Sequence, residues 1–142
     1  MLGIDYGARR IGLAISDATG TLASPWRLVE RPPSEAQTLG LVGDIIERLK
    51  QDDDGLGAVV VGWPRRLDGS PTHQTAAAEA FARALEARAG LRVILQDERL
   101  SSHEADQRLA AGGERDWRAR KKKIDAMAAA IILQDYLDYV PR

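Results

Sequence analysis

The sequence of 142 residues contains no cysteine. Disulfide bridges and thiolate metal sites are therefore excluded, and any bound metal must be held by oxygen ligands or by the two histidines. A chain of this length can bury an ordinary hydrophobic core without such cross-links. We therefore expect one domain, residues 1–142, in a reducing compartment such as the cytoplasm.

Long apolar runs and an excess of positive charge are also lacking. The longest apolar run is too short to span a bilayer, and Asp5 leaves no room for a secretion signal before it. We expect a soluble, unprocessed protein with no membrane partner. With 20 basic and 21 acidic residues the net charge is -1, so the whole surface does not favour a polyanion and any nucleic-acid surface must be local.

Five apolar segments have the length and pattern of β-strands. The first two surround a tight turn and predict a hairpin, whereas the last two are apolar throughout, as is typical of buried strands covered on both faces. The predicted strands are Met1–Ile4, Arg10–Ser16, Leu22–Val29, Ala58–Gly62 and Leu91–Leu95.

Apolar residues recur at helical spacing in most of the remaining chain. We predict helices that begin at a Ser34 cap, that cover Ala78–Ala89 before Gly90, that begin at a Ser101 capping box, and that run from about Ala119 to Tyr139. The order βββαβαβαα predicts a mixed five-stranded sheet, an antiparallel meander followed by parallel strands, with helices on both faces.

Acidic residues interrupt two of the predicted strand regions. Asp5 lies in an apolar strand between Gly3 and Gly7, so the backbone there can be approached closely. Asp97 and Glu98 follow the last predicted strand at its carboxyl end, where open α/β sheets place their ligands. Each acid taken alone could equally begin a turn or solvate a loop.

Asp125 is less ordinary, because it shares an apolar helix stripe with Ala128, Ala129 and Ile132. An ionised carboxylate there needs a basic partner, a proton or a metal ion, and a structural salt bridge is the main alternative. If Asp5, Glu98 and Asp125 converge, divalent metal would relieve their repulsion. Two such ions, Mg²⁺ or Mn²⁺, about 4 Å apart suit phosphodiester hydrolysis.

Basic residues crowd the first turn of the last predicted helix, where cations oppose the helix dipole. Bound phosphate would offset that cost, although a solvated charge run is the alternative. Trp117 could stack a base or be an ordinary packed tryptophan. Arg10 could pair with Asp17 instead of binding nucleic acid. The candidate nucleic-acid-binding residues are Arg9, Arg10, Arg118, Arg120, Lys121, Lys122 and Lys123, with Arg65 and Arg66 as an extension.

Ser101 and Ser102 precede His103 and could suggest a nucleophile, but consecutive positions at a helix start favour capping. We do not expect His73 or His103 to bind metal.

Several motifs together resemble the YqgF family, a bacterial group described as Holliday-junction-resolvase-like or as nucleases of precursor 16S ribosomal RNA. The resemblance extends from Leu2 to Asp138 and is carried by Gly3–Gly7, Arg10–Ala14, Ser16–Asp17, Asp97–Ser101 and Lys121–Ala129. It implies a ribonuclease-H-like fold, a divalent metal, and acidic site residues at Asp5, Glu98 and Asp125.

The chain departs from the family pattern in two places. Gly62-Trp63-Pro64 has tryptophan where the family usually has leucine, and Ser70–His73 matches loosely. These departures concern substrate contacts and leave the predicted metal site intact.

We predict a metal-dependent nuclease acting on structured nucleic acid, with precursor 16S rRNA, trimmed at its 5′ end, favoured over branched DNA. Lys121–Lys123 would hold the phosphate backbone, and the protein would be a monomer or a weak homodimer. Three alternatives stay open: a Holliday-junction resolvase, a non-catalytic RNA-binding or transcription factor, and an ATP-binding fold of the sugar-kinase and actin type. The last requires a second such domain.

Overall fold

The computed structural model describes residues 1–64, 68–97 and 117–139, with the backbone alone for residues 117–123, 125 and 126. Its five strands form one sheet in the order β3-β2-β1-β4-β5. The first three strands pair antiparallel, and β1, β4 and β5 are parallel, which confirms the predicted mixed sheet. The strands are β1 (Leu2–Tyr6), β2 (Arg10–Ser16), β3 (Ala23–Glu30), β4 (Ala58–Trp63) and β5 (Arg92–Asp97).

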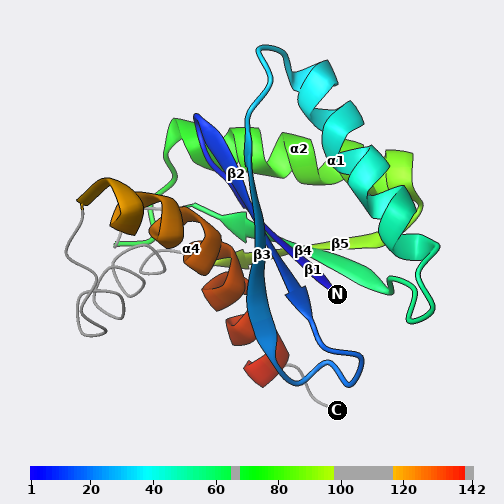
Figure 1. The fold of residues 1–142 in the computed structure, drawn as a ribbon. Helices are drawn as coiled ribbons and strands as arrows, with labels where there is room; N and C mark the ends of the chain where they lie inside the picture. The colour runs from blue at the N-terminus through cyan, green and yellow to red at the C-terminus, as the bar shows by residue number, and fades with distance from the viewer. Residues whose placement is uncertain (65–67, 98–116, 140–142) are drawn as a thin grey trace.

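Helices cover both faces of this sheet, as predicted (Figure 1). Helices α1 (Glu35–Lys50) and α2 (His73–Ala89) pack on one face, and α4 (Trp117–Tyr139) packs on the other, which we call the α4 face. None of the helices within the described ranges is long and apolar enough to cross a membrane.

Local sequence explains where α1 and α2 begin and end. The Ser34 hydroxyl accepts a hydrogen bond from the Gln37 N–H at 3.1 Å and completes a capping box at the start of α1. Gly90 follows α2 with φ of 67°, a left-handed conformation that glycine adopts without a steric penalty. Thr72, which was not predicted as a cap, caps the start of α2.

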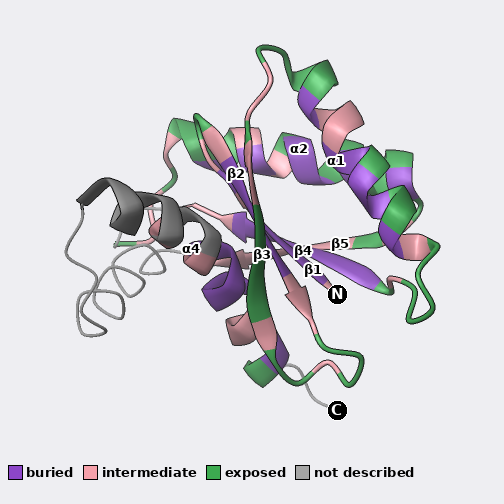
Figure 2. Cartoon of the chain, in the orientation of Figure 1, coloured by how far each residue is buried: buried purple, intermediate pink, exposed green. Residues whose placement is uncertain are grey.

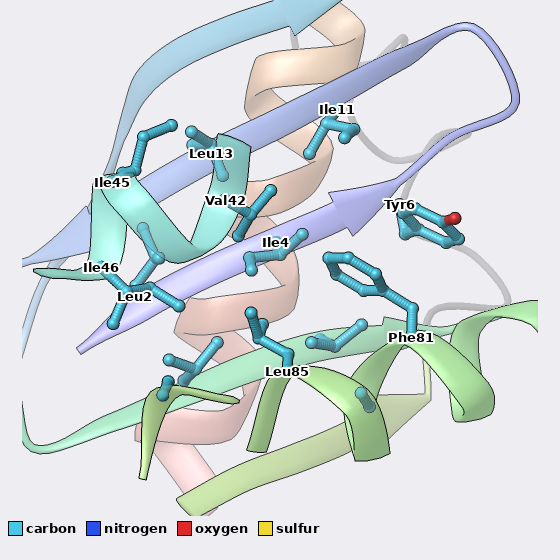
Figure 3. Packing of buried hydrophobic residues seen from close by; sticks show 14 of the residues in the cluster. Leu2, Ile4, Tyr6, Ile11, Leu13, Val42, Ile45, Ile46, Phe81 and Leu85 are labelled. Atoms are coloured by element: carbon cyan, nitrogen blue, oxygen red, sulfur yellow. The ribbon is translucent and has the colours of Figure 1, made fainter. Parts of the chain in front are cut away.

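Strand alternation divides the core between the two faces. Leu2, Ile4 and Tyr6 of β1 point toward α1 and α2, where Tyr6 stacks on Phe81 with ring centroids 4.3 Å apart (Figure 3). Because successive strand residues alternate sides, Gly3 and Asp5 belong to the α4 face.

Strand β5 differs from its prediction as a buried strand. It is the edge strand beyond β4, its first residue is exposed and the others are half-buried. An apolar run predicts that a strand is buried, but it does not show whether the strand lies at the centre or at the edge of the sheet. The strand also extends to Asp97, which pairs with Trp63 and therefore does not lie in the following loop. The helix predicted to begin at Ser101 lies outside the described residues.

Candidate active site

Asp5 is the predicted site residue that the structure describes most fully. It is half-buried near the end of β1, and its antiparallel partner on β2 is Gly12. On the other side Ile4 pairs with Val61, so the next residue of β4, Gly62, lies beside Asp5. Both glycines are buried. The two residues directly opposite Asp5 on the neighbouring strands therefore carry no side chain.

Gly3 confirms the prediction that the backbone near Asp5 is closely approached. A Cβ atom at Gly3 would lie 2.8 Å from the Leu133 Cβ and 3.0 Å from the Ala129 carbonyl oxygen. Glycine is therefore required for α4 to lie this close to β1. Gly7 serves a different purpose, because its N–H donates to the Arg10 carbonyl at 3.1 Å and closes the β1–β2 turn.

The direction of α4 follows from its contacts with β3. The Gln134 amide accepts from the Ala23 N–H at 2.9 Å and donates to the Thr21 carbonyl at 3.0 Å. These bonds hold the later half of α4 at the end of the sheet where β1 begins, because Ala23 pairs with Ser16 and the Ser16 N–H donates to the Met1 carbonyl. The earlier half of α4 therefore extends toward the edge where β1, β4 and β5 end, which we call the carboxyl edge.

The helical register brings position 125 toward Asp5. Asp125 is four residues before Ala129 in one continuous helix, about 6 Å along its axis and on the same side. Asp5 is two residues beyond Gly3, about 7 Å along the strand in the same direction. The Asp125 side chain is not described. Its backbone lies one helical turn beyond the contact between Ala129 and Gly3, in the direction of Asp5.

Glu98 lies outside the described residues, and its neighbour Asp97 does not share a face with Asp5. Leu95 packs on the α1 and α2 side, whereas Ile94 packs against the α4 core. Asp97 is two residues from Leu95 in the same strand, so it points to the same face as Leu95, the face opposite to that of Asp5. Gln96, paired with Gly62, is the β5 residue in the row of Asp5.

The candidate basic residues fall into two groups. Arg9 is exposed in the β1–β2 turn, and Arg10 is half-buried opposite Glu30 on β3. Arg118, Arg120 and Lys121–Lys123 belong to the first turns of α4, where only the backbone is described. Arg65 and Arg66, like Ser101 to His103, lie outside the described residues.

The alternative pairing of Arg10 with Asp17 is wrong. Asp17 follows the opposite end of β2, about 24 Å away along the strand. Its carboxylate instead accepts hydrogen bonds from the backbone N–H groups of Thr21 at 2.8 Å and Leu22 at 3.2 Å. These two bonds hold the pKa of Asp17 below its ordinary value.

Arg31 supports the turn that follows Asp5 and was not identified from the sequence. Its guanidinium carbon lies 4.3 Å from the centre of the Tyr6 ring, and its Nη1 donates to the Gly7 carbonyl at 3.3 Å. Burial raises the pKa of Tyr6, an effect that the Arg31 charge opposes. The only indication in the sequence is the antiparallel meander, which brings the end of β3 to the β1–β2 turn.

Among the residues whose side chains are described, no three acidic or histidine side chains form a metal site. The side chains of Glu98 and Asp125 lie outside that set. Asp5 provides carboxylate oxygen, the ligand type that Mg²⁺ and Mn²⁺ prefer, and glycines lie opposite it on both flanking strands. The described part of the site therefore fits a divalent ion.

Comparison with known proteins shows the family to which the chain belongs. The model of the RuvX family, described as Holliday junction resolvase, matches residues 1–139. The chain belongs to the RuvX family. A relative from Maridesulfovibrio salexigens is 42% identical over 137 residues, 96% of each chain, and one from Geobacillus kaustophilus is 38% identical over 139 residues, again 96% of each chain. Both carry the name of a candidate pre-16S rRNA nuclease, and the resemblance noted in the sequence is confirmed.

Solved structures confirm the ribonuclease-H-like fold of this RuvX chain. RuvC of Thermus thermophilus, in complex with a Holliday junction, superposes with a TM-score of 0.55 at 17% identity, covering 96% of this chain and 91% of RuvC. A ROK hexokinase from the same organism gives a TM-score of 0.51 at 21% identity, covering 75% of this chain but 38% of the kinase. The sugar-kinase alternative raised from the sequence is thus supported only as a similarity of fold.

Proposed function

We propose that this RuvX chain is a divalent-metal-dependent nuclease that hydrolyses phosphodiester bonds in structured nucleic acid. The observation that carries the proposal is the position of Asp5 at the carboxyl edge of the sheet, between Gly12 and Gly62 and close to α4. A carboxylate on an otherwise apolar strand, with glycine opposite it on both sides, is suited to binding a cation. The N–H of Gly7 in the following turn is bonded to the backbone carbonyls of Asp5 and Arg10, so it does not need the Asp5 carboxylate.

Glu98 and Asp125 would complete the site. Glu98 directly follows β5 in the sequence, and Asp125 belongs to the same helix side as Ala129. The three carboxylates would hold one or two ions, Mg²⁺ or Mn²⁺. When bound, such ions supply an activated water and stabilise the leaving oxygen. Arg9, Arg10 and the basic first turns of α4 would hold the phosphate backbone on either side.

We infer that the substrate is precursor 16S rRNA, processed at its 5′ end in the cytoplasm. The names of the relatives favour this choice. The second candidate is a four-way DNA junction, which the family description favours. Both are branched or folded polyanions, so the metal site serves either substrate without change.

The test compares cleavage of a precursor 16S rRNA fragment and of a four-way DNA junction with Mn²⁺ or Mg²⁺. We expect Asp5→Asn, Glu98→Gln and Asp125→Asn each to lower the cleavage rate by at least about 100-fold, because each removes a metal ligand. Chelation of the metal should have the same effect on the wild-type protein.

Two isosteric variants serve as matched controls. Asp97→Asn changes the acid beside Glu98 that belongs to the opposite face, and Asp17→Asn changes an acid at the far end of the sheet. Both should cleave at nearly the wild-type rate. Unchanged cleavage by Asp5→Asn would contradict the assigned site. A protein that binds RNA in a salt-dependent way but cleaves neither substrate would be a binding factor and not a nuclease.

A further inference from the structure

The middle of β3 is an exposed aromatic and basic edge that the proposed metal site does not use. Residues 24–27 of this strand are exposed, as the green band along β3 shows (Figure 2). Trp26 is 38% exposed, and the Arg27 guanidinium carbon lies 5.4 Å from the centre of its ring. We call residues 24–27 the Trp26 edge.

The Trp26 edge is poorly suited to pairing with another strand. Pro25 has no N–H to donate, and the register between β2 and β3 shifts by one residue at Trp26. Such a bulge and a proline are devices that discourage edge-to-edge strand addition. An exposed tryptophan on an edge protected in this way therefore favours a partner that is recognised through side chains.

The charge of β3 and of the β1–β2 turn beside it favours binding of a polyanion. Residues 9–31 carry four arginines and two acids, and one of these acids, Asp17, lies at the far end of β2. Arg9, Arg10 and Arg31 lie where β3 reaches the β1–β2 turn, and Arg27 lies beside Trp26. The chain as a whole has a charge of -1, so this arginine-rich end of the β2–β3 ladder is a local positive region.

The Trp26 edge is close to the proposed active site. Leu28 pairs with Gly12, which pairs with Asp5, so these residues form one row across β3, β2 and β1. Trp26 is two residues from that row. With strands about 4.8 Å apart and about 3.4 Å per residue, the Trp26 and Asp5 Cα atoms are roughly 12 Å apart. A nucleic acid held at Asp5 could reach the ring within a few nucleotides.

We propose that the Trp26 ring stacks an unpaired base of the nucleic-acid substrate, flanking the scissile phosphate, while Arg27 contacts the adjoining phosphate. The proposal rests on the nuclease function inferred above. It identifies a requirement for unpaired nucleotides beside the cleavage point. Stacking on an aromatic ring accepts any base, so this contact would contribute affinity and register but little sequence preference.

The test measures binding of a fluorescent single-stranded RNA by anisotropy, with the metal chelated so that no cleavage occurs. We expect Trp26→Ala to weaken binding by about 5- to 100-fold and Trp26→Phe, which keeps a ring, to bind within about twofold of wild type. Arg27→Gln should reduce the slope of log affinity against log salt by about 1. RNA should quench part of the tryptophan fluorescence of the wild type, and Trp26→Phe should lose that part.

Leu22→Ala is the matched control, because Leu22 is exposed just before the same strand but has no ring to stack. It should bind as wild type, and thermal unfolding should show that each variant remains folded. The proposal is overturned if Trp26→Ala binds as wild type, or if Leu22→Ala loses as much affinity. It is also overturned if Trp26→Ala changes only self-association in sedimentation. Asp5→Asn should retain binding while losing cleavage, so failure of the nuclease assignment remains separate from failure of this one.

Discussion

Replacing Gly3 with alanine tests whether the contact between β1 and α4 positions the proposed site. The new Cβ would lie 2.8 Å from the Leu133 Cβ and 3.0 Å from the Ala129 carbonyl oxygen. Both atoms are fixed to the helix backbone, so α4 itself must move by several tenths of an ångström or more. Overpacking of this kind costs about 1 to 3 kcal/mol. For a chain of this size, each kcal/mol lowers Tm by about 3 °C.

The effect on catalysis should exceed the effect on folding. Position 125 is one turn from Ala129, so a displaced α4 would carry Asp125 away from Asp5. A shift of about 1 Å at a catalytic group can lower the rate by about 100-fold. We therefore expect Gly3→Ala to be folded at room temperature, to unfold about 3 to 10 °C below wild type, and to lose one to two orders of magnitude in cleavage rate.

Gly40→Ala provides the matched control for this prediction. Gly40 lies within α1, and a Cβ there would meet nothing within 4 Å. The substitution should stabilise the protein by about 0.5 to 1 kcal/mol and leave cleavage unchanged. The measurements are thermal unfolding by circular dichroism and initial cleavage rates below the melting transition. If Gly3→Ala cleaves as fast as Gly40→Ala, α4 does not hold an essential group beside Asp5 and the reasoning is refuted.

Two further predictions concern the ends of β2. Arg31→Ala should lower the free energy of unfolding by about 1 to 2 kcal/mol, because it removes the contact with the Tyr6 ring and the bond to Gly7; equal urea midpoints for variant and wild type would contradict this. Asp17 has a lowered pKa, so its contribution to stability is present above its unfolded value of 3.8 and is lost as pH falls through the folded pKa. The stability difference between wild type and Asp17→Asn should therefore shrink from about pH 7 to about pH 3, and a constant difference in urea unfolding would argue against it.

The sequence features that predicted the helices and strands each involve residues close together in the chain. Ser34 caps α1 by bonding to Gln37, only three residues along the chain. Gly90 ends α2 because glycine readily adopts the left-handed φ of 67° found there. Such features depend on residues within one turn, so the sequence alone determines them. The ordered motifs that indicated the family are likewise visible along the chain. Asp5, Glu98 and Asp125 stand out both from these motifs and from their positions in the predicted strands and helix.

Sequence therefore determined the type and order of the elements, the family and the candidate acids. Only the tertiary structure decided that β5 is an edge strand, that Gly12 and Gly62 flank Asp5, and that Asp97 belongs to the opposite face. Each of these facts depends on which strands exchange hydrogen bonds and in which register, and a shift of one residue would turn every side chain to the other face. That register is set by packing between residues far apart in the chain, as where α4 meets Gly3.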